Sequence, residues 1–163
     1  MKIIDNLPDK RWAEYRDLRI QALVDVPQAF LDEPSQAKKL DAKEWQRKME
    51  NMIFAEADDK LVGMVGAYQD EKKKLQHIVN IVSFYVILNY HSQGVGRALL
   101  QAVIDKYQDK PGLKKLQLGV TTTQKPAQHL YKSLGFKQVG ELKYTVKVDK
   151  QFFNEYLMEL YLD

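Results

Sequence analysis

The hydrophobic period changes along the chain, and this change restricts how the chain can fold. Trp12, Tyr15, Leu18 and Ala22 recur at spacings of three and four, which is typical of an amphipathic helix. Between residues 53 and 88 the apolar residues form short runs rich in Val, Ile, Phe and Tyr, which favour strands. A chain with both periods has to pack helices against a sheet.

The same reasoning along the whole sequence gives an order of elements. Helices are predicted at about residues 12–23, 41–50, 94–107 and 127–134. Strands are predicted at about residues 1–4, 53–57, 61–68, 78–88, 116–121, 144–148 and 156–162, and the last two are predicted to form a hairpin whose connection is residues 149–155. Asp41 is the predicted N-cap of the second helix, and Gly135 suits the left-handed end of the last one. The order predicts one mixed α/β domain over residues 1–163 around a central sheet.

Charge and hydropathy exclude several classes of protein. The 25 Lys and Arg residues against 22 Asp and Glu residues leave a formal charge of +3, too mild to favour a nucleic-acid binder. No apolar run approaches the ~20 residues of a membrane span, and the first residues lack the apolar segment of a secretory signal. We therefore expect a cytoplasmic protein without a membrane or nucleic-acid partner.

The chain has no cysteine, which excludes disulfides, thiolate metal sites and a cysteine acyl-enzyme. Its three histidines, His77, His91 and His129, lack the spacing of metal ligands. No metal site is predicted.

The segment from Phe84 to Leu100 carries the clearest chemical signal. A strand leads into a short turn, and the turn leads into a helix that starts near Gly94 and Gly96. The first turn of a helix has unpaired amides and a positive partial charge, and glycine lets an anion approach them. The segment favours a diphosphate site, although a Gly-x-Gly alone also fits a tight turn without a ligand.

Two familiar phosphate-binding loops do not match this segment. The Rossmann fingerprint needs a third glycine where Leu99 stands. The P-loop needs Gly-Lys-Ser/Thr, whereas Gly96 is followed by Arg97-Ala98.

Phe84-Tyr85-Val86 followed by Gln93-Gly94-Val95-Gly96 resembles the hallmark of the GNAT superfamily of acetyl-CoA-dependent N-acetyltransferases. A second element of that superfamily resembles the stretch from Gln124 to Phe136, which includes Leu130-Tyr131 and Gly135-Phe136. The resemblance covers nearly the whole chain. His91, Ser92 and Gln124 depart from it, since Arg or Gln, Gly and Asn are usual there.

The resemblance implies a GNAT-like fold, with a mostly antiparallel twisted sheet that splays between its middle strands and about four flanking helices. It also implies acetyl-CoA as a cosubstrate. The CoA arm would pair with the strand end at Tyr85, Val86, Ile87 and Leu88. The diphosphate and its surroundings would contact His91, Ser92, Gln93, Gly94, Val95, Gly96, Arg97 and Ala98, with Gln124 and Tyr131 as further cofactor contacts.

Catalysis needs a proton donor for the departing thiolate and a route for the proton of the amine. The resemblance assigns the donor role to Tyr131, which by spacing alone is also a core residue. No carboxylate lies in residues 78–88, where many relatives place a glutamate, so His77 is the candidate base or substrate contact. Glu33, Glu56 and water relayed through Ser83 are alternatives.

The acceptor is predicted to be a primary amine of a small molecule. A protein N-terminus or lysine is an alternative, and so is a regulatory module that binds CoA without catalysis. Aromatic residues either line the acceptor site or belong to the core: Trp12, Tyr15, Phe30, Trp45 and Tyr144. Exposed apolar positions in residues 156–162 would permit a homodimer, and a monomer is the alternative.

Overall fold

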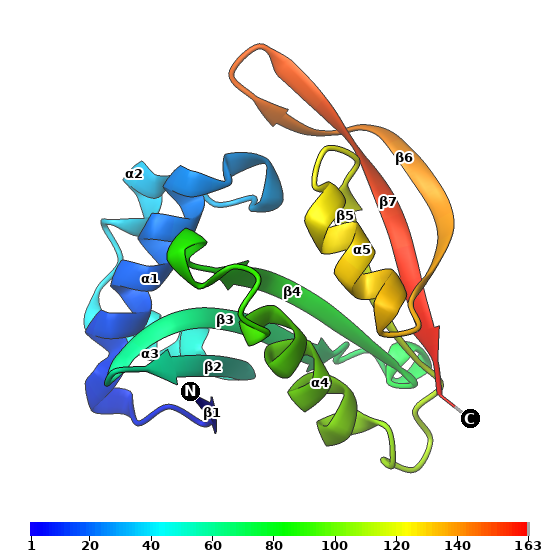
Figure 1. Cartoon of the computed structure of the whole chain (residues 1–163), viewed down its shortest axis with the longest axis horizontal. Helices are drawn as coiled ribbons and strands as arrows, with labels where there is room; N and C mark the ends of the chain where they lie inside the picture. The colour runs from blue at the N-terminus through cyan, green and yellow to red at the C-terminus, as the bar shows by residue number, and fades with distance from the viewer. Residues whose placement is uncertain (163) are drawn as a thin grey trace. The chain divides into compact units, whose positions relative to one another are not determined.

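The computed structural model describes residues 1–162, which form seven strands and five α-helices (Figure 1). The strands are β1 (Lys2–Asp5), β2 (Met52–Ala57), β3 (Lys60–Gln69), β4 (Ile78–Val86), β5 (Lys115–Thr121), β6 (Lys137–Val148) and β7 (Gln151–Tyr161). The helices are α1 (Trp12–Asp25), α2 (Pro34–Ala37), α3 (Ala42–Met49), α4 (Val95–Tyr107) and α5 (Lys125–Ser133).

The strands form one sheet in the order β1-β2-β3-β4-β5-β7-β6. The β1–β2, β2–β3, β5–β7 and β6–β7 pairs are antiparallel, and β4 pairs with β5 in parallel. In this parallel pairing, Ile78 lies opposite Lys115 and Asn80 lies opposite Gln117. Both strands continue beyond these residues. The predicted fold class, a mixed α/β protein with a mostly antiparallel sheet, is confirmed.

The contacts divide the chain into two compact units. Met1–Gly66 and Ser83–Ala102 form unit 1. Ala67–Val82 and the chain from Val103 onward form unit 2. The prediction of a single domain over residues 1–163 stays a prediction.

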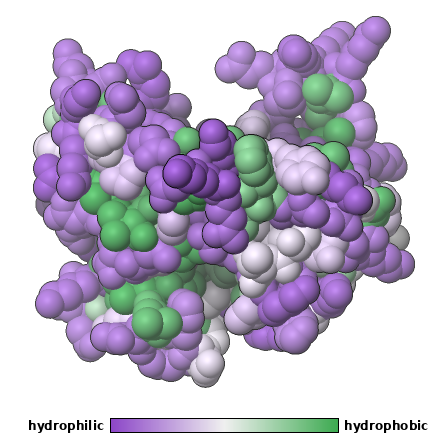
Figure 2. Space-filling view, turned by 90° about the horizontal axis from the view of Figure 1, so that it is seen from above, coloured by the Kyte–Doolittle hydropathy of each residue, from purple (hydrophilic) through white to green (hydrophobic). Residues whose placement is uncertain are grey.

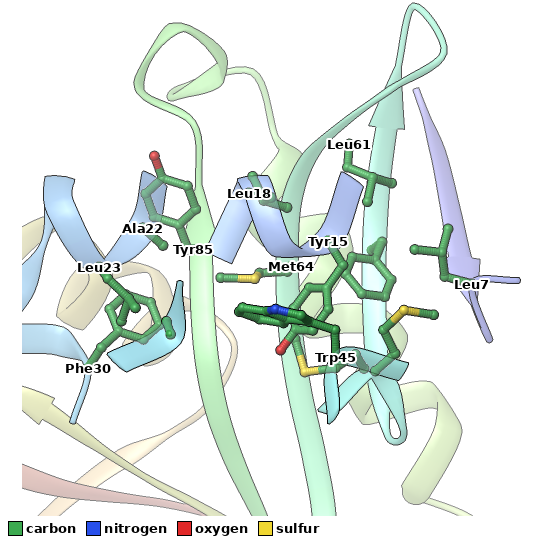
Figure 3. Close-up of a cluster of buried hydrophobic side chains, with 14 residues drawn as sticks. Leu7, Tyr15, Leu18, Ala22, Leu23, Phe30, Trp45, Leu61, Met64 and Tyr85 are labelled. Carbon is green, nitrogen blue, oxygen red and sulfur yellow. The ribbon is translucent and has the colours of Figure 1, made fainter. Parts of the chain in front are cut away.

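In unit 1, helices α1 and α3 pack on strands β2 and β3 around a buried aromatic cluster (Figure 3). The ring of Tyr15 meets Trp45 and Phe54 edge-on, with 5.5 Å between centroids in both pairs. Phe30 is buried in the same core. Tyr15, Phe30 and Trp45 are therefore core residues, one of the two roles that the sequence left open.

The N-terminus of α3 shows how local chemistry places a helix. The Asp41 carboxylate accepts from Glu44 N at 2.9 Å, and the Glu44 carboxylate accepts from Asp41 N at 2.8 Å. This reciprocal capping box satisfies two amides that the helix itself leaves unpaired. It confirms Asp41 as the N-cap.

In unit 2, α5 lies along strands β5, β7 and β6 (Figure 1). Large apolar side chains are buried here. They are Leu116, Leu118, Val120, Tyr131, Phe136 and Met158. Gly135 has φ +95°, the left-handed conformation expected at the end of α5.

Several predicted boundaries are wrong, and β6 begins at Lys137 rather than at about residue 144. The connection predicted at 149–155 is mostly strand, because Val148 already pairs with Gln151 across a two-residue turn. The hairpin itself is confirmed, but its ladder depends on backbone hydrogen bonds, so its polar side chains did not reveal how far the two strands extend. The strand predicted to reach Leu88 ends at Val86, and the four-residue helix α2 was not predicted.

No helix within residues 1–162 is both long enough and apolar enough to cross a membrane. On the face that Figure 2 shows, hydrophobic side chains lie in separate patches among hydrophilic ones. Tyr144 and Phe152 are two exposed aromatics, and they form an edge-to-face pair on the β6–β7 hairpin. Tyr144 is thus not part of the core.

Candidate functional site

The turn between β4 and α4 in unit 1 is held by backbone hydrogen bonds. Ile87 N donates to Val62 O on β3 at 2.9 Å, which fixes the end of β4. A short 3₁₀ turn over Leu88–Tyr90 follows, closed by Tyr90 N to Ile87 O at 2.9 Å. The chain that continues from this turn leads directly to α4.

His91 folds back onto the strand that precedes it. Its Nε2 lies 2.8 Å from Val86 O. A carbonyl oxygen can only accept, so Nε2 carries the proton and donates. His91 N also donates to Leu88 O at 3.0 Å. The residue predicted to contact a phosphate therefore braces the turn, and its cofactor contact stays a prediction.

The start of α4 has the features of an anion site. Gly94 has φ +81°, and a Cβ placed there would meet nothing within 4 Å, so open space surrounds this position. Ala98 N donates to Gly94 O at 3.0 Å. The amides of Val95 and Gly96 precede this bond at the positive end of a 13-residue helix. The open position and these amides fit a diphosphate group.

Gln93 and the buried face of α4 fix this helix start in place. Gln93 Nε2 donates to Asn89 O at 2.7 Å. Val95, Leu99 and Leu100 are buried and anchor the first turns of the helix. The amides of the first turn are thus presented by a braced loop.

The strand end predicted to pair with CoA is partly engaged within unit 1. Val86 O, Ile87 O and Leu88 O each accept a hydrogen bond from the turn, and Ile87 N donates to β3. The Tyr85 hydroxyl donates to Asp25 Oδ2 on α1 at 2.5 Å. Burial, together with the Asp25 carboxylate, raises the pKa of Tyr85 well above its usual range. The side chain of Tyr85 thus ties β4 to α1.

A buried arginine that the sequence analysis did not single out also joins α1 to β4. Arg19 is 8% exposed; its Nη1 donates to Ser83 Oγ at 2.6 Å and its Nη2 to Asp32 Oδ2 at 3.0 Å. Its guanidinium lies 4.7 Å from the centroid of the Phe30 ring. Burial raises the pKa of Asp32, but Arg19 and Lys48 outweigh it, so the pKa is lowered.

Ser83 has an unusual backbone conformation within β4. Its φ of +56° is left-handed, which is uncommon for a residue other than glycine. The hydroxyl of Ser83 is the acceptor for Arg19, so the buried arginine holds this residue. The Ser83 hydroxyl accepts this bond and keeps its own proton, and the water relay through Ser83 stays a prediction.

In unit 2, the turn after β5 brings two predicted cofactor contacts to one short segment. Thr121 Oγ1 donates to Gln124 Oε1 at 3.1 Å, and Gln128 Nε2 donates to Thr121 O at 3.1 Å. Tyr131 follows on α5; it is 5% exposed, and its ring centroid lies 5.9 Å from that of Phe136. Burial raises the pKa of Tyr131 well above its usual range, so its phenol is protonated at neutral pH.

His77 lies at the opposite end of β5 from Gln124. Its backbone oxygen accepts from Lys114 N at 2.8 Å, just before β5 begins. The seven residues of β5 span about 20 Å, and Gln124 follows its far end. The structure does not bring His77 and Gln124 together, and the role of His77 stays a prediction.

The other candidate bases have different surroundings. Glu56 forms an ion pair with Arg11 at 2.6 Å, and Glu33 immediately precedes α2. Within residues 1–162, no group of three or more His, Cys, Asp or Glu side chains could hold a metal ion.

Glu155 on β7, which was not among the residues predicted from the sequence, is partly buried, and burial raises its pKa.

Comparison with known proteins gives consistent matches. Residues 12–136 match the Acetyltransferase (GNAT) family. An N-alpha-acetyltransferase of Sulfurisphaera tokodaii is 31% identical over 147 residues, covering 83% of this chain and 87% of the relative. Human N-acetyltransferase 8 is 28% identical over 137 residues, covering 83% of this chain and 54% of the relative. The chain thus spans about half the length of that human relative.

A solved structure shares the fold. The structure of yncA from Salmonella typhimurium with its cofactor acetyl-CoA matches with a TM-score of 0.84 and 18% identity. The match covers 99% of this chain and 94% of that chain.

Proposed function

This chain belongs to the acetyltransferase (GNAT) family, and on that premise we propose that it transfers the acetyl group of acetyl-CoA to a primary amine. The predicted family is thereby confirmed. The observation that carries the proposal is the start of α4, where Gly94 at φ +81° opens the approach to the amides of Val95 and Gly96. The structure of yncA, which has the same fold and holds acetyl-CoA, supports this choice of ligand.

Acetyl-CoA supplies an acetyl group that is already activated as a thioester. In the proposed complex, Val95 N and Gly96 N bind the diphosphate, while His91 keeps the turn folded through Val86 O. Within unit 2, Gln124 accepts a hydrogen bond from Thr121, and its cofactor contact stays a prediction. Tyr131 is the proposed donor to the departing thiolate, and its raised pKa keeps it in the protonated form that a donor needs.

The amine has to lose a proton before it attacks. An alkyl ammonium has a pKa of ~10.4, so its deprotonation at pH 7 costs roughly 4.6 kcal/mol of free energy. A carboxylate or imidazole near the acceptor lowers this barrier by taking the proton in place.

A small-molecule amine is the first candidate acceptor. A peptide α-amino group is the second, and the observation that favours it is the 31% identity to a protein named N-alpha-acetyltransferase. Both acceptors present the same chemistry, a primary amine that attacks the thioester carbonyl.

Thiol release from acetyl-CoA tests the proposal directly. The acceptor panel should contain polyamines, amino acids, aminoglycosides and peptides with a free N-terminus, and the matching N-acetylated peptides serve as controls. We expect micromolar binding of acetyl-CoA by calorimetry and thiol release with at least one class of amine. Folded protein that binds neither CoA nor acetyl-CoA would contradict the proposal. Tight binding without acceptor-dependent release would instead indicate a non-catalytic CoA-binding module.

A further inference from the structure

The sheet of unit 2 has one face that lies away from its buried core. Cα partners in neighbouring strands share a face, and here the partners are Gln117 with Glu159, Gly119 with Leu157, and Thr121 with Glu155. The alternate residues of β5 point to the buried core. This face thus carries polar side chains together with Gly119 and one apolar side chain, Leu157.

A cavity of about 220 Å³ opens on this face. Its lining includes Asn80, Gln117, Gly119, Leu157 and Glu159. Polar groups in its wall are paired: Gln117 Nε2 donates to Asn80 Oδ1 at 2.8 Å. The wall of this cavity thus combines polar and apolar groups.

The carboxylate of Glu155 lies directly on Gly119, one of the lining residues. A Cβ built at Gly119 would be 2.5 Å from Cδ of Glu155, 3.1 Å from Oε2 and closer still to Oε1. The absence of a side chain at Gly119 is therefore what allows the carboxylate to occupy this place. Glycine is needed here for space, since its φ is not in the left-handed region.

Glu155 differs from the neighbouring Glu159 in its partners. The Glu159 carboxylate pairs with Lys115 Nζ and accepts from the Tyr161 hydroxyl at 2.7 Å. Within residues 1–162, the Glu155 carboxylate forms no hydrogen bond or ion pair. Burial is the cause that raises its pKa. An unpaired carboxylate that is partly withdrawn from water attracts a cation or a proton.

The position of Glu155 also connects it with a predicted cofactor contact. Its register partner on β5 is Thr121, whose hydroxyl donates to Gln124 at 3.1 Å. The backbone of Glu155 is therefore paired with the last residue of β5, which leads into α5, while its carboxylate lies at Gly119.

We propose that Glu155 is the general base of the transfer and binds the ammonium group of the acceptor. This inference rests on the proposed function. The Glu155 carboxylate takes one proton from R–NH₃⁺ and becomes the neutral acid. The nitrogen lone pair then forms the C–N bond, and the C–S bond breaks with its electron pair leaving on sulfur. Tyr131, the proposed donor, protonates the thiolate to the thiol. The nitrogen releases its second proton, which restores Tyr131 by way of water, and Glu155 returns its own proton to water.

Few charged groups lie near Glu155 in unit 2. On β6 its partner is Leu142, flanked by Glu141 and Lys143, and Glu141 accepts from Asn154 Nδ2 at 3.0 Å. The residues of β5 beside it, from Gly119 to Thr121, do not titrate. On β7 itself, the nearest carboxylate on the same face is Glu159, which is paired with Lys115.

Two variants separate the charge of Glu155 from its position. Glu155→Gln removes the charge and keeps the shape, whereas Gly119→Ala keeps the charge and displaces the carboxylate. The control is Glu71→Gln, an exposed glutamate of the same unit. Each is measured for acetyl-CoA affinity by calorimetry and for acceptor kcat/KM from pH 5 to 9.

We expect Glu155→Gln to lower acceptor kcat/KM about 100-fold at neutral pH and to abolish the acidic limb of the profile, with unchanged acetyl-CoA affinity. Gly119→Ala should lower kcat/KM and retain a shifted limb, and Glu71→Gln should match the wild type. A wild-type rate or acidic limb in Glu155→Gln overturns the role of Glu155 and leaves the proposed function intact. A wild-type protein that releases no thiol with any acceptor overturns both.

Discussion

A charged side chain can stay buried only when its environment compensates for the lost water, and Arg19 meets this condition with three kinds of contact. Asp32 supplies charge, Ser83 a hydroxyl acceptor, and Phe30 the face of an aromatic ring. Arg19 Nε has no partner among the described residues. The guanidinium is thus fixed through its two Nη atoms, and its bond to Ser83 holds α1 to β4 in unit 1.

Tyr131→Phe tests the proposed proton donor. The variant keeps the ring packed beside Phe136 and loses only the hydroxyl, so we expect roughly a tenfold to hundredfold lower kcat and an unchanged Kd for acetyl-CoA. Tyr107→Phe is the matched control, because Tyr107 is also buried and its hydroxyl donates to Ala67 O at 3.1 Å. It should lose stability and keep kcat. If the wild type, Tyr131→Phe and Tyr107→Phe had equal kcat values, Tyr131 would have no role in the mechanism.

The pH dependence of stability gives a second readout for Glu155. Burial raises its pKa in the folded state, so its contribution is fully present below the unfolded value of about 4.3 and is lost as the pH rises through the folded value. We expect Glu155→Gln to melt on the order of 2 °C higher than the wild type at pH 8, with no difference at pH 4.

Glu159→Gln is the opposed control for that measurement. Its hydrogen bond to Lys115 lowers the pKa of Glu159, so its contribution is present above the unfolded value and is lost as the pH falls. This variant should be less stable than the wild type at pH 8 and should approach it in acid. A lower melting temperature for Glu155→Gln at pH 8 would show that its carboxylate has a stabilising partner.

At the level of elements, the strand–turn–helix from β4 to α4 acts as one structure. His91 braces the turn against Val86, and Gly94 provides the left-handed step before the helix. The position of Gly94, just before the first amides of the helix, is open. A change in the backbone of this turn should affect ligand binding more than the same change elsewhere.

Gly94→Ala tests this expectation, and Gly112→Ala is its matched control. Both glycines have left-handed φ values, +81° and +85°, and a Cβ at either would meet nothing within 4 Å. Each alanine should cost about 1–2 kcal/mol of folding stability, because both force an L-residue into the same conformation. Only Gly94→Ala should also weaken acetyl-CoA binding, by about tenfold, as measured by calorimetry. Equal affinities for the two variants would place the diphosphate elsewhere.

For the whole molecule, ligand binding and stability are linked. A ligand that binds only the folded state at 100 times its Kd adds about 2.7 kcal/mol to the free energy of unfolding. For a chain of this length we expect acetyl-CoA to raise the melting temperature by about 5–10 °C. Pantetheine, which lacks the diphosphate, should raise it much less at the same concentration. Equal shifts for both ligands would contradict a site built on the amides of α4.

The sequence by itself determined the features that depend on neighbouring residues. The helices α1, α3, α4 and α5 were predicted from apolar spacing, because a helix buries residues three and four positions apart. The cap at Asp41 and the left-handed end of α5 at Gly135 were predicted because their chemistry acts within a few residues. The family followed from two such local motifs.

Only the tertiary structure decided which distant residues meet. Arg19 and Ser83 are 64 positions apart, and no local pattern places a hydroxyl beside that guanidinium. The same holds for the carboxylate of Glu155, which lies on Gly119 because the register of β5 and β7 brings them together. Register depends on the whole sheet, so the alignment of side chains across strands follows from long-range packing and is absent from the local sequence.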